Sequence, residues 1–256
     1  MSKKDLLIIT GAGQGIGKNI ALNVHDKYDL LLISKSNNCK KVALRIKKIS
    51  NNSARKIKYL KIDLGKKFNE KLIFKNSNVK MYEKIHLILC AAVVDSKKKS
   101  YLNEEKWKEI FNINFFSNIK IINIFLKFYT KSRAQNKIII FSGGGATNSF
   151  KEFPIYSATK TALIRTVENY SEIFSKSKLS IFAVAPGAIK TNMLKKVLKS
   201  AKVGTKSKMF EVTKFINQCL KINTSTFNGK LIHIKDNIRK IFKKKNTNYL
   251  KLRRFK

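Results

Sequence analysis

The sequence is poor in acidic residues and in cysteine. It contains 15 Asp and Glu against 55 Lys and Arg, which gives a formal net charge of +40 over 256 residues. The three cysteines, Cys39, Cys90 and Cys219, are widely spaced and form no C-x-x-C pair. Neither a disulfide framework nor a zinc site is predicted, so we expect three free thiols and no metal.

Long apolar runs are also absent. The longest, around Leu87 to Val94, is far shorter than the roughly 20 residues of a membrane-spanning helix, and it fits a buried strand. The opening Met-Ser-Lys-Lys-Asp is followed at once by a predicted strand and a glycine loop, which leaves no room for a signal peptide. We therefore expect a cytoplasmic protein with no membrane span.

The excess of positive charge has two interpretations. A strongly basic chain is typical of nucleic-acid binding. However, the basic residues are spread through nearly every segment, with runs at 97–99, 243–245 and 253–254, and accompany no nucleic-acid motif. Lysine, asparagine and isoleucine are over-used together, which indicates a biased composition. We expect no specific nucleic-acid partner, only non-specific contact with polyanions.

Apolar runs and amphipathic segments alternate along the chain. The apolar runs predict strands at 5–9, 29–34, 56–64, 84–94, 137–142, 179–185 and 230–234. The amphipathic segments predict helices at 18–27, 39–50, 68–75, 103–131, 154–175 and 209–220. This order predicts an α/β fold: a Rossmann-type, doubly wound parallel sheet of about seven strands in three αβα layers. We expect residues 1–256 to form a single domain with a basic tail at about 236–256.

A glycine-rich loop, Thr10-Gly-Ala-Gly-Gln-Gly-Ile-Gly17, separates the first strand from the first helix. Glycine lets the backbone turn tightly and approach a ligand without an intervening Cβ atom. The free amides of the following helix would face a pyrophosphate. The placement between strand and helix therefore predicts a dinucleotide site.

A tyrosine and a lysine four residues apart, Tyr156 and Lys160, lie on one face of the helix predicted at 154–175. A free tyrosine has a pKa near 10, and a neighbouring ammonium favours the phenolate and lowers that pKa. We therefore predict that Tyr156 is a general acid or base. Alone, the same spacing also fits two exposed polar residues one turn apart.

Five motifs in register resemble the classical short-chain dehydrogenase/reductase family, over Thr10 to about Leu231. They are Thr10-x-x-x-Gly15-x-Gly17, Asp63 after the third strand, Asn114, Tyr156-x-x-x-Lys160, and Pro186-Gly187 with Thr191. The resemblance implies an oxidoreductase that moves a hydride between a nicotinamide cofactor and a secondary alcohol or ketone.

The resemblance also implies the residues that bind the cofactor. Those beside the diphosphate and adenosine are Gly11, Gly15, Ile16, Gly17 and Asp63, and those beside the nicotinamide are Tyr156, Lys160, Pro186, Gly187 and Thr191. Asp63 would bond the adenine, although a turn residue at the end of a strand explains it equally well.

The catalytic residues implied by the resemblance are Tyr156, Lys160, Asn114 and a serine. Tyr156 would exchange a proton with the substrate oxygen, while Lys160 lowers its pKa and binds the nicotinamide ribose. Asn114 would support a water that links Lys160 to solvent; alternatively, it is a polar residue that points outward from the middle of its helix.

Two departures from the family pattern bear on the site. Cys90-Ala-Ala-Val93 stands where the family has Asn-Asn-Ala-Gly. The family serine, thirteen residues before the tyrosine, is replaced by Gly143, and Ser142 lies one position earlier. We expect a one-residue shift to bring the Ser142 hydroxyl toward Tyr156. The alternative keeps the register and leaves Thr147, Ser149 or a backbone amide as the second donor.

The second strand ends in Ser34-Lys-Ser-Asn37, with no carboxylate and with Lys35 placed to meet a 2′-phosphate. We therefore expect NADP, with NAD possible. Ser142-Gly-Gly-Gly-Ala146, Pro186-Gly-Ala-Ile-Lys-Thr191, Gly229-Lys-Leu-Ile232 and Leu252-Arg-Arg254 also resemble a subgroup associated with sugar and surface-polysaccharide genes.

That resemblance favours a small-molecule substrate, a sugar or a sugar derivative. The alternatives are a 3-oxoacyl-thioester reductase of lipid synthesis and a degenerate member that binds nucleotide as a regulator. The family resemblance further implies a homo-dimer or homo-tetramer through the helices that begin at Asn103 and Pro154.

Overall fold

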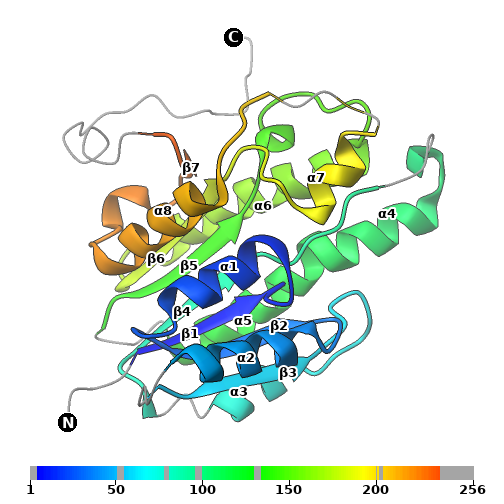
Figure 1. Cartoon of the computed structure of the whole chain (residues 1–256). Coiled ribbons are helices and arrows are strands. Elements are labelled where there is room, and N and C mark those ends of the chain that lie inside the picture. Colours follow the sequence, from blue (N-terminus) through cyan, green and yellow to red (C-terminus); the bar gives the residue numbers. More distant parts are fainter. Residues whose placement is uncertain are drawn as a thin grey trace.

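A computed structural model describes residues 5–50, 55–77, 81–95, 100–129, 134–199, 201 and 204–236 (Figure 1). Its single sheet has seven parallel strands in the order β3-β2-β1-β4-β5-β6-β7. The strands are β1 Asp5–Thr10, β2 Asp29–Ser34, β3 Ile57–Lys61, β4 Lys84–Leu89, β5 Asn136–Phe141, β6 Leu179–Ala185 and β7 Leu231–His233. The predicted doubly wound parallel sheet is confirmed. Its winding reverses between β1 and β4.

Helices cover both faces of the sheet, which explains why its strands read as continuous apolar runs. Alternate residues of β1 face opposite ways: Leu7 and Ile9 belong to one core cluster, and Leu6 and Ile8 to the other. The first cluster lies under α1 Gly15–Val24, α2 Asn38–Ile49 and α8 Met209–Lys221. The second lies under α3 Lys71–Ser77, α5 Ser117–Tyr129 and α6 Pro154–Ile173. Figure 1 shows these as the outer layers of a three-layer domain.

The helix predicted over 103–131 is not uniform. It consists of α4 Glu104–Phe111, a π-helical turn at Asn112–Phe116, and α5. A π turn inserted in an α-helix frequently marks a functional site. The fourth strand also ends at Leu89, earlier than predicted, because residues 90–95 leave the sheet and form a loop. The predicted basic tail lies outside the described residues from 237 onward.

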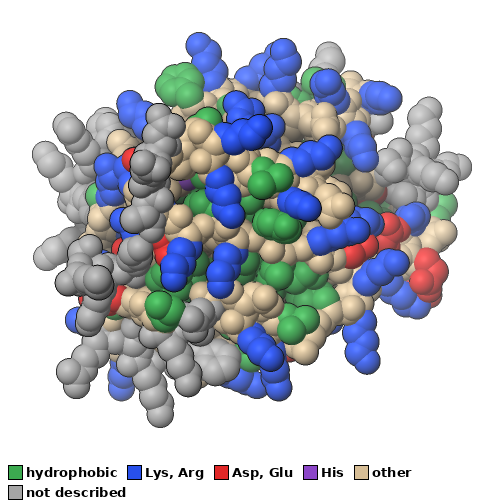
Figure 2. Space-filling view, turned by 60° about the horizontal axis from the view of Figure 1, so that its bottom comes forward, with side chains coloured by type: hydrophobic (Ala, Val, Ile, Leu, Met, Phe, Trp, Pro, Cys, Tyr) green, Lys and Arg blue, Asp and Glu red, His purple; other side chains and the backbone are tan. Residues whose placement is uncertain are grey.

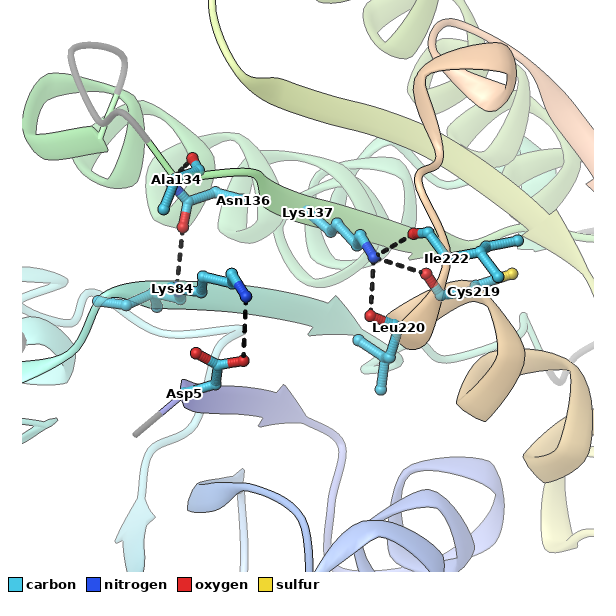
Figure 3. A network of polar contacts seen from close by, with 9 residues as sticks. Asp5, Lys84, Ala134, Asn136, Lys137, Cys219, Leu220 and Ile222 are labelled. Atoms are coloured by element: carbon cyan, nitrogen blue, oxygen red, sulfur yellow. Dashed lines mark hydrogen bonds and ion pairs between the residues drawn. The ribbon is translucent and has the colours of Figure 1, made fainter. Parts of the chain in front are cut away.

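A buried lysine ties α8 to the sheet at the edge opposite the glycine loop (Figure 3). Lys137 Nζ, at the start of β5, donates hydrogen bonds to the carbonyl oxygens of Cys219, Leu220 and Ile222 at 2.9, 2.7 and 2.7 Å. The last carbonyls of a helix have no partner within it, and a cation suits that end of the helix dipole. Burial lowers the pKa of Lys137 to about 8. This cap fixes the end of α8 against β5.

On the face shown in Figure 2, the described basic side chains form no single stripe. Figure 2 shows Lys and Arg side chains scattered over the whole visible face, between apolar and neutral ones. All three cysteines are free, as predicted. Within the described part of the chain, no helix combines the length and apolarity needed to cross a membrane.

Candidate active site

The loops that follow β1, β4, β5 and β6 lie at the carboxyl edge of the sheet. Since β1 has β2 on one side and β4 on the other, the chain reverses its winding beside β1. Open parallel sheets bind ligands in the crevice at this switch point. The sequence-predicted residues come together around it.

The glycine loop is held close to its neighbours. A Cβ at Gly11, whose φ is +66°, would lie 2.9 Å from the Ala91 backbone nitrogen, and one at Gly17 would lie 2.7 Å from the Gly11 carbonyl oxygen. Both distances are too short for a side chain, so the loop requires glycine at these positions. Helix α1 then begins at Gly15 with no side-chain cap at Gln14. The first-turn amides, including that of Ile16, are available for an anion.

The loop after β6 meets the glycine loop. Pro186 and Gly187 form the turn after β6, and Thr191 follows at the start of α7 Asn192–Val197, where its Oγ1 accepts a hydrogen bond from the Leu194 amide at 3.2 Å. A Cβ at Gly15 would lie 3.5 Å from Thr191 Cγ2. The structure therefore places Gly15, which is predicted to lie beside the diphosphate, next to Thr191, which is predicted to contact the nicotinamide.

Lys35 and Asp63 lie after β2 and β3 and form an ion pair of 3.1 Å. Asp63 Oδ1 also accepts a hydrogen bond from the Gly65 amide at 3.0 Å, so the turn interpretation of Asp63 is correct, and its contact with an adenine stays a prediction. Partial burial of Asp63 favours a higher pKa, but the hydrogen bonds from Lys35 and Gly65 outweigh it and lower the pKa. Lys35 itself is largely exposed.

Tyr156 and Lys160 both lie in α6, as predicted. Lys160 is 3% exposed, and its Nζ donates a hydrogen bond to the Phe141 carbonyl oxygen at 2.8 Å while lying 5.6 Å from the centre of the Tyr156 ring. Burial lowers the pKa of Lys160 to about 8 and raises the pKa of Tyr156 to about 12. The lowered pKa predicted for Tyr156 is therefore wrong for the protein alone, because burial of the phenol raises it. At neutral pH the tyrosine keeps its proton.

Asn114 is fully buried in the π turn, so the outward-pointing alternative is wrong. Its Oδ1 accepts a hydrogen bond from the Val93 amide at 2.8 Å, and its Nδ2 donates to the Val93 carbonyl at 2.9 Å and to Thr159 Oγ1 at 3.1 Å. The Asn114 carbonyl accepts from Asn118 Nδ2 at 2.6 Å. The water predicted beside Asn114 stays a prediction. The sequence analysis missed Thr159, which lies one turn after Tyr156.

The loop after β4 is held by residues outside it. The Ala91 amide donates to Thr10 Oγ1 at 3.3 Å, and Val93 is held through both its amide and its carbonyl by Asn114. Cys90-Ala-Ala-Val93 thus lacks the family's asparagine side chains but keeps polar anchors at its second and fourth residues.

Gly143 faces Tyr156. A Cβ at Gly143 would lie 3.5 Å from Tyr156 Oη. Ser142 is 4% exposed, and its Oγ has no hydrogen-bond partner within the described part of the chain. No hydrogen bond joins Ser142 Oγ to Tyr156 among the described residues, and the role of Ser142 as the second donor stays a prediction. The position opposite Tyr156 carries no side chain.

Comparison with known proteins agrees with this geometry. The family model described as short chain dehydrogenase matches residues 5–202, and the chain therefore belongs to the short-chain dehydrogenase family of oxidoreductases. Among curated relatives, the hydroxynaphthalene reductase-like protein Arp2 of Metarhizium brunneum is 23% identical over 188 residues, which cover 73% of this chain and 68% of the relative.

Two solved structures have the same fold. ElxO with NADP bound is 22% identical, with a TM-score of 0.74 over 91% of this chain and 97% of its own. The 3-oxoacyl-[acyl-carrier protein] reductase from Brucella melitensis in complex with NAD is 17% identical, with a TM-score of 0.78 over 91% of this chain and 96% of its own. Membership of the sugar-associated subgroup has no support in these comparisons.

The position of Gly143 generates the first prediction. A serine there would fit, since its Cβ would contact Tyr156 Oη at an ordinary 3.5 Å, and its hydroxyl would add a donor for the substrate oxygen. Removing one such donor from an enzyme costs about 10²- to 10³-fold in kcat, so we expect Gly143→Ser to raise kcat for ketone reduction by about 10-fold or more.

Gly143→Ala is the matched control, because it adds the same Cβ without the hydroxyl. We expect no gain in kcat from this variant. Steady-state assays of both variants with one ketone decide the matter, and equal rates in the two would contradict the role assigned to position 143.

Proposed function

We propose that this protein is an NADP(H)-dependent oxidoreductase that reduces a ketone to a secondary alcohol, with Tyr156 as the proton donor. The observation that carries the proposal is the placement of Tyr156 and the buried Lys160 at the end of β5, on the carboxyl edge of the sheet. Family membership and the reductase names of the similar proteins support it.

The residues present fit a dinucleotide. Gly11 and Gly17 let the loop pack closely against the Ala91 backbone and its own, and the uncapped start of α1 offers amides to the charge of a diphosphate. Pro186, Gly187 and Thr191 would hold the nicotinamide end, and Lys35 and Asp63 the adenosine end. When bound, the cofactor supplies the hydride, and the protein supplies position and the proton.

The pKa values of Tyr156 and Lys160 indicate which group supplies the proton. Burial raises the pKa of Tyr156 to about 12, so its phenol is protonated at neutral pH and can donate to a carbonyl oxygen that is gaining negative charge. The Lys160 ammonium, held by the Phe141 carbonyl, stabilises the phenolate that remains after donation. This division of roles favours reduction over alcohol oxidation near neutral pH.

Lys35 favours NADP(H) over NAD(H), because a 2′-phosphate needs a cation and the residues after β2 include no carboxylate. In the absence of a ligand, Lys35 is paired with Asp63, and binding must share or replace that contact. The NADP named in the ElxO structure supports this preference, while the NAD complex of the reductase from Brucella melitensis leaves NAD as a second cofactor.

Two substrate classes are considered: a sugar derivative, and an aromatic or 3-oxoacyl ketone. A sugar derivative was predicted from the sequence, whereas the similar proteins are named for hydroxynaphthalene and 3-oxoacyl substrates. We therefore favour an aromatic or 3-oxoacyl ketone.

A second candidate function is a regulator that binds nucleotide without turnover, which the absence of a side chain at Gly143 supports. We also propose a homo-dimer or homo-tetramer, for which Phe116 and Ile173, 47% and 67% exposed, supply apolar surface.

The second prediction tests the proton donor. Tyr156→Phe removes the phenol and leaves the rest of the pocket, so we expect it to bind NADPH as the wild type does and to lose turnover by roughly 10²- to 10⁴-fold. Oxidation of NADPH with a panel of aromatic, 3-oxoacyl and sugar ketones measures turnover, and quenching of nicotinamide fluorescence measures binding. Undiminished turnover in the variant would contradict the assignment.

The third prediction concerns the cofactor. Lys35→Glu removes the cation and adds a carboxylate, so we expect the Kd for NADPH to rise by about 10- to 100-fold, the range of one charge-assisted hydrogen bond, while the Kd for NADH changes little or falls. Lys127→Glu makes the same charge change on the exposed face of α5 and should alter both constants slightly and equally. A Lys35→Glu enzyme with an unchanged ratio of the two constants would rule out this role.

A further inference from the structure

We propose that Asp95 positions Tyr156 for proton transfer, an inference that rests on the proposed function. Asp95 lies in the loop after β4, where neither the motifs nor the resemblance singled it out. Its side chain is 3% exposed, and its Oδ1 accepts a hydrogen bond from the Tyr156 backbone amide at 3.2 Å. A residue 61 positions earlier in the chain thus holds the peptide that carries the catalytic side chain.

Helix α6 needs an acceptor at this point. It begins at Pro154, which has no N–H, and the preceding Phe153 has no side chain that can cap it. The first backbone bond of the helix runs from the Ser157 amide to the Phe153 carbonyl, so the Tyr156 amide lacks a partner within the helix. The Asp95 carboxylate fills that place, and a negative charge there also suits the helix dipole.

The contact closes a ring of hydrogen bonds around Tyr156. From Asp95 the ring runs back along the loop to Val93, whose amide and carbonyl are both held by Asn114. Asn114 Nδ2 donates to Thr159 Oγ1, and the Thr159 hydroxyl donates to the Tyr156 carbonyl at 2.7 Å. Both polar groups of the Tyr156 peptide are therefore fixed, one by the loop and one through the π turn.

This ring determines where the phenol lies. Tyr156 is the third residue of α6, in the turn that loses helical structure first when a cap is missing. A buried carboxylate without hydrogen bonds costs free energy. The bond between Asp95 and the Tyr156 amide therefore also holds the loop after β4 against α6. Because a displacement of about 1 Å can cost roughly 10²-fold in rate, loss of the cap should reduce kcat without removing a group that touches the substrate.

Three variants at one position separate geometry from charge. Asp95→Ala removes the acceptor, and we expect kcat to fall by about 10- to 100-fold with the Kd for NADPH unchanged. Asp95→Asn keeps an acceptor oxygen of the same reach and should recover most of kcat. Asp95→Glu keeps the charge but moves the acceptor by one methylene, so it should resemble Asp95→Ala and also serve if the alanine variant fails to fold.

The matched control is Asn69→Ala. Asn69 Oδ1 accepts a hydrogen bond from the Lys71 amide at 3.0 Å and so caps α3, under a different part of the sheet. We expect this variant to lose stability and to keep the wild-type kcat per folded molecule. Hydrogen exchange of the Tyr156 amide should accelerate in Asp95→Ala and Asp95→Glu, and in neither Asn69→Ala nor Asp95→Asn.

The outcomes distinguish the inference from the function beneath it. A wild-type protein that binds NADPH and turns over no ketone overturns the proposed function. The positioning role alone is overturned if the wild type is active and Asp95→Ala keeps both the wild-type kcat and a slowly exchanging Tyr156 amide. It is also overturned if the kcat of Asp95→Asn is no higher than that of Asp95→Ala.

Discussion

The site depends on one buried hydrogen bond, from Lys160 Nζ to the Phe141 carbonyl. A buried ammonium is costly unless its donors are satisfied, and the end of a strand supplies an acceptor to Lys160, which is 3% exposed. The bond joins α6 to the end of β5, which fixes the helix above the switch point of the sheet. The same burial that lowers the pKa of Lys160 raises that of Tyr156. Burial thus accompanies the fixed position of Lys160 and also shifts the pKa values of both side chains.

Around this bond, the chain achieves the family geometry with altered residues. The loop after β4 has lost the family's asparagines, yet Thr10 and Asn114 hold its backbone from outside. Gly143, which stands at the position of the family's serine and faces Tyr156, carries no side chain. A reductase with one fewer donor is expected to be slower, or to depend on the substrate or the backbone for the missing hydrogen bond.

Much of the fold could be predicted, because strands buried on both faces leave continuous apolar runs and the glycine loop marks the first turn. The π turn at Asn112–Phe116 could not, since its residues have ordinary helical periodicity. The Asp95 contact joins segments 61 residues apart and depends on the path of a loop. The raised pKa of Tyr156 reflects burial, which the spacing of Tyr156 and Lys160 does not reveal, and the pairing of Lys35 with Asp63 likewise needs the two strand ends in space.

The central claim is that Tyr156 is a protonated donor near neutral pH. Its most direct test is the pH dependence of the wild-type rate in both directions, between about pH 5 and pH 7, below the Lys160 pKa of about 8, where Lys160 keeps its charge. Ketone reduction uses the protonated phenol, so its rate should be nearly constant. Alcohol oxidation needs the phenolate, whose fraction rises about 10-fold per pH unit below the pKa, and its rate should rise accordingly. An oxidation rate that stays flat over this range would contradict the account.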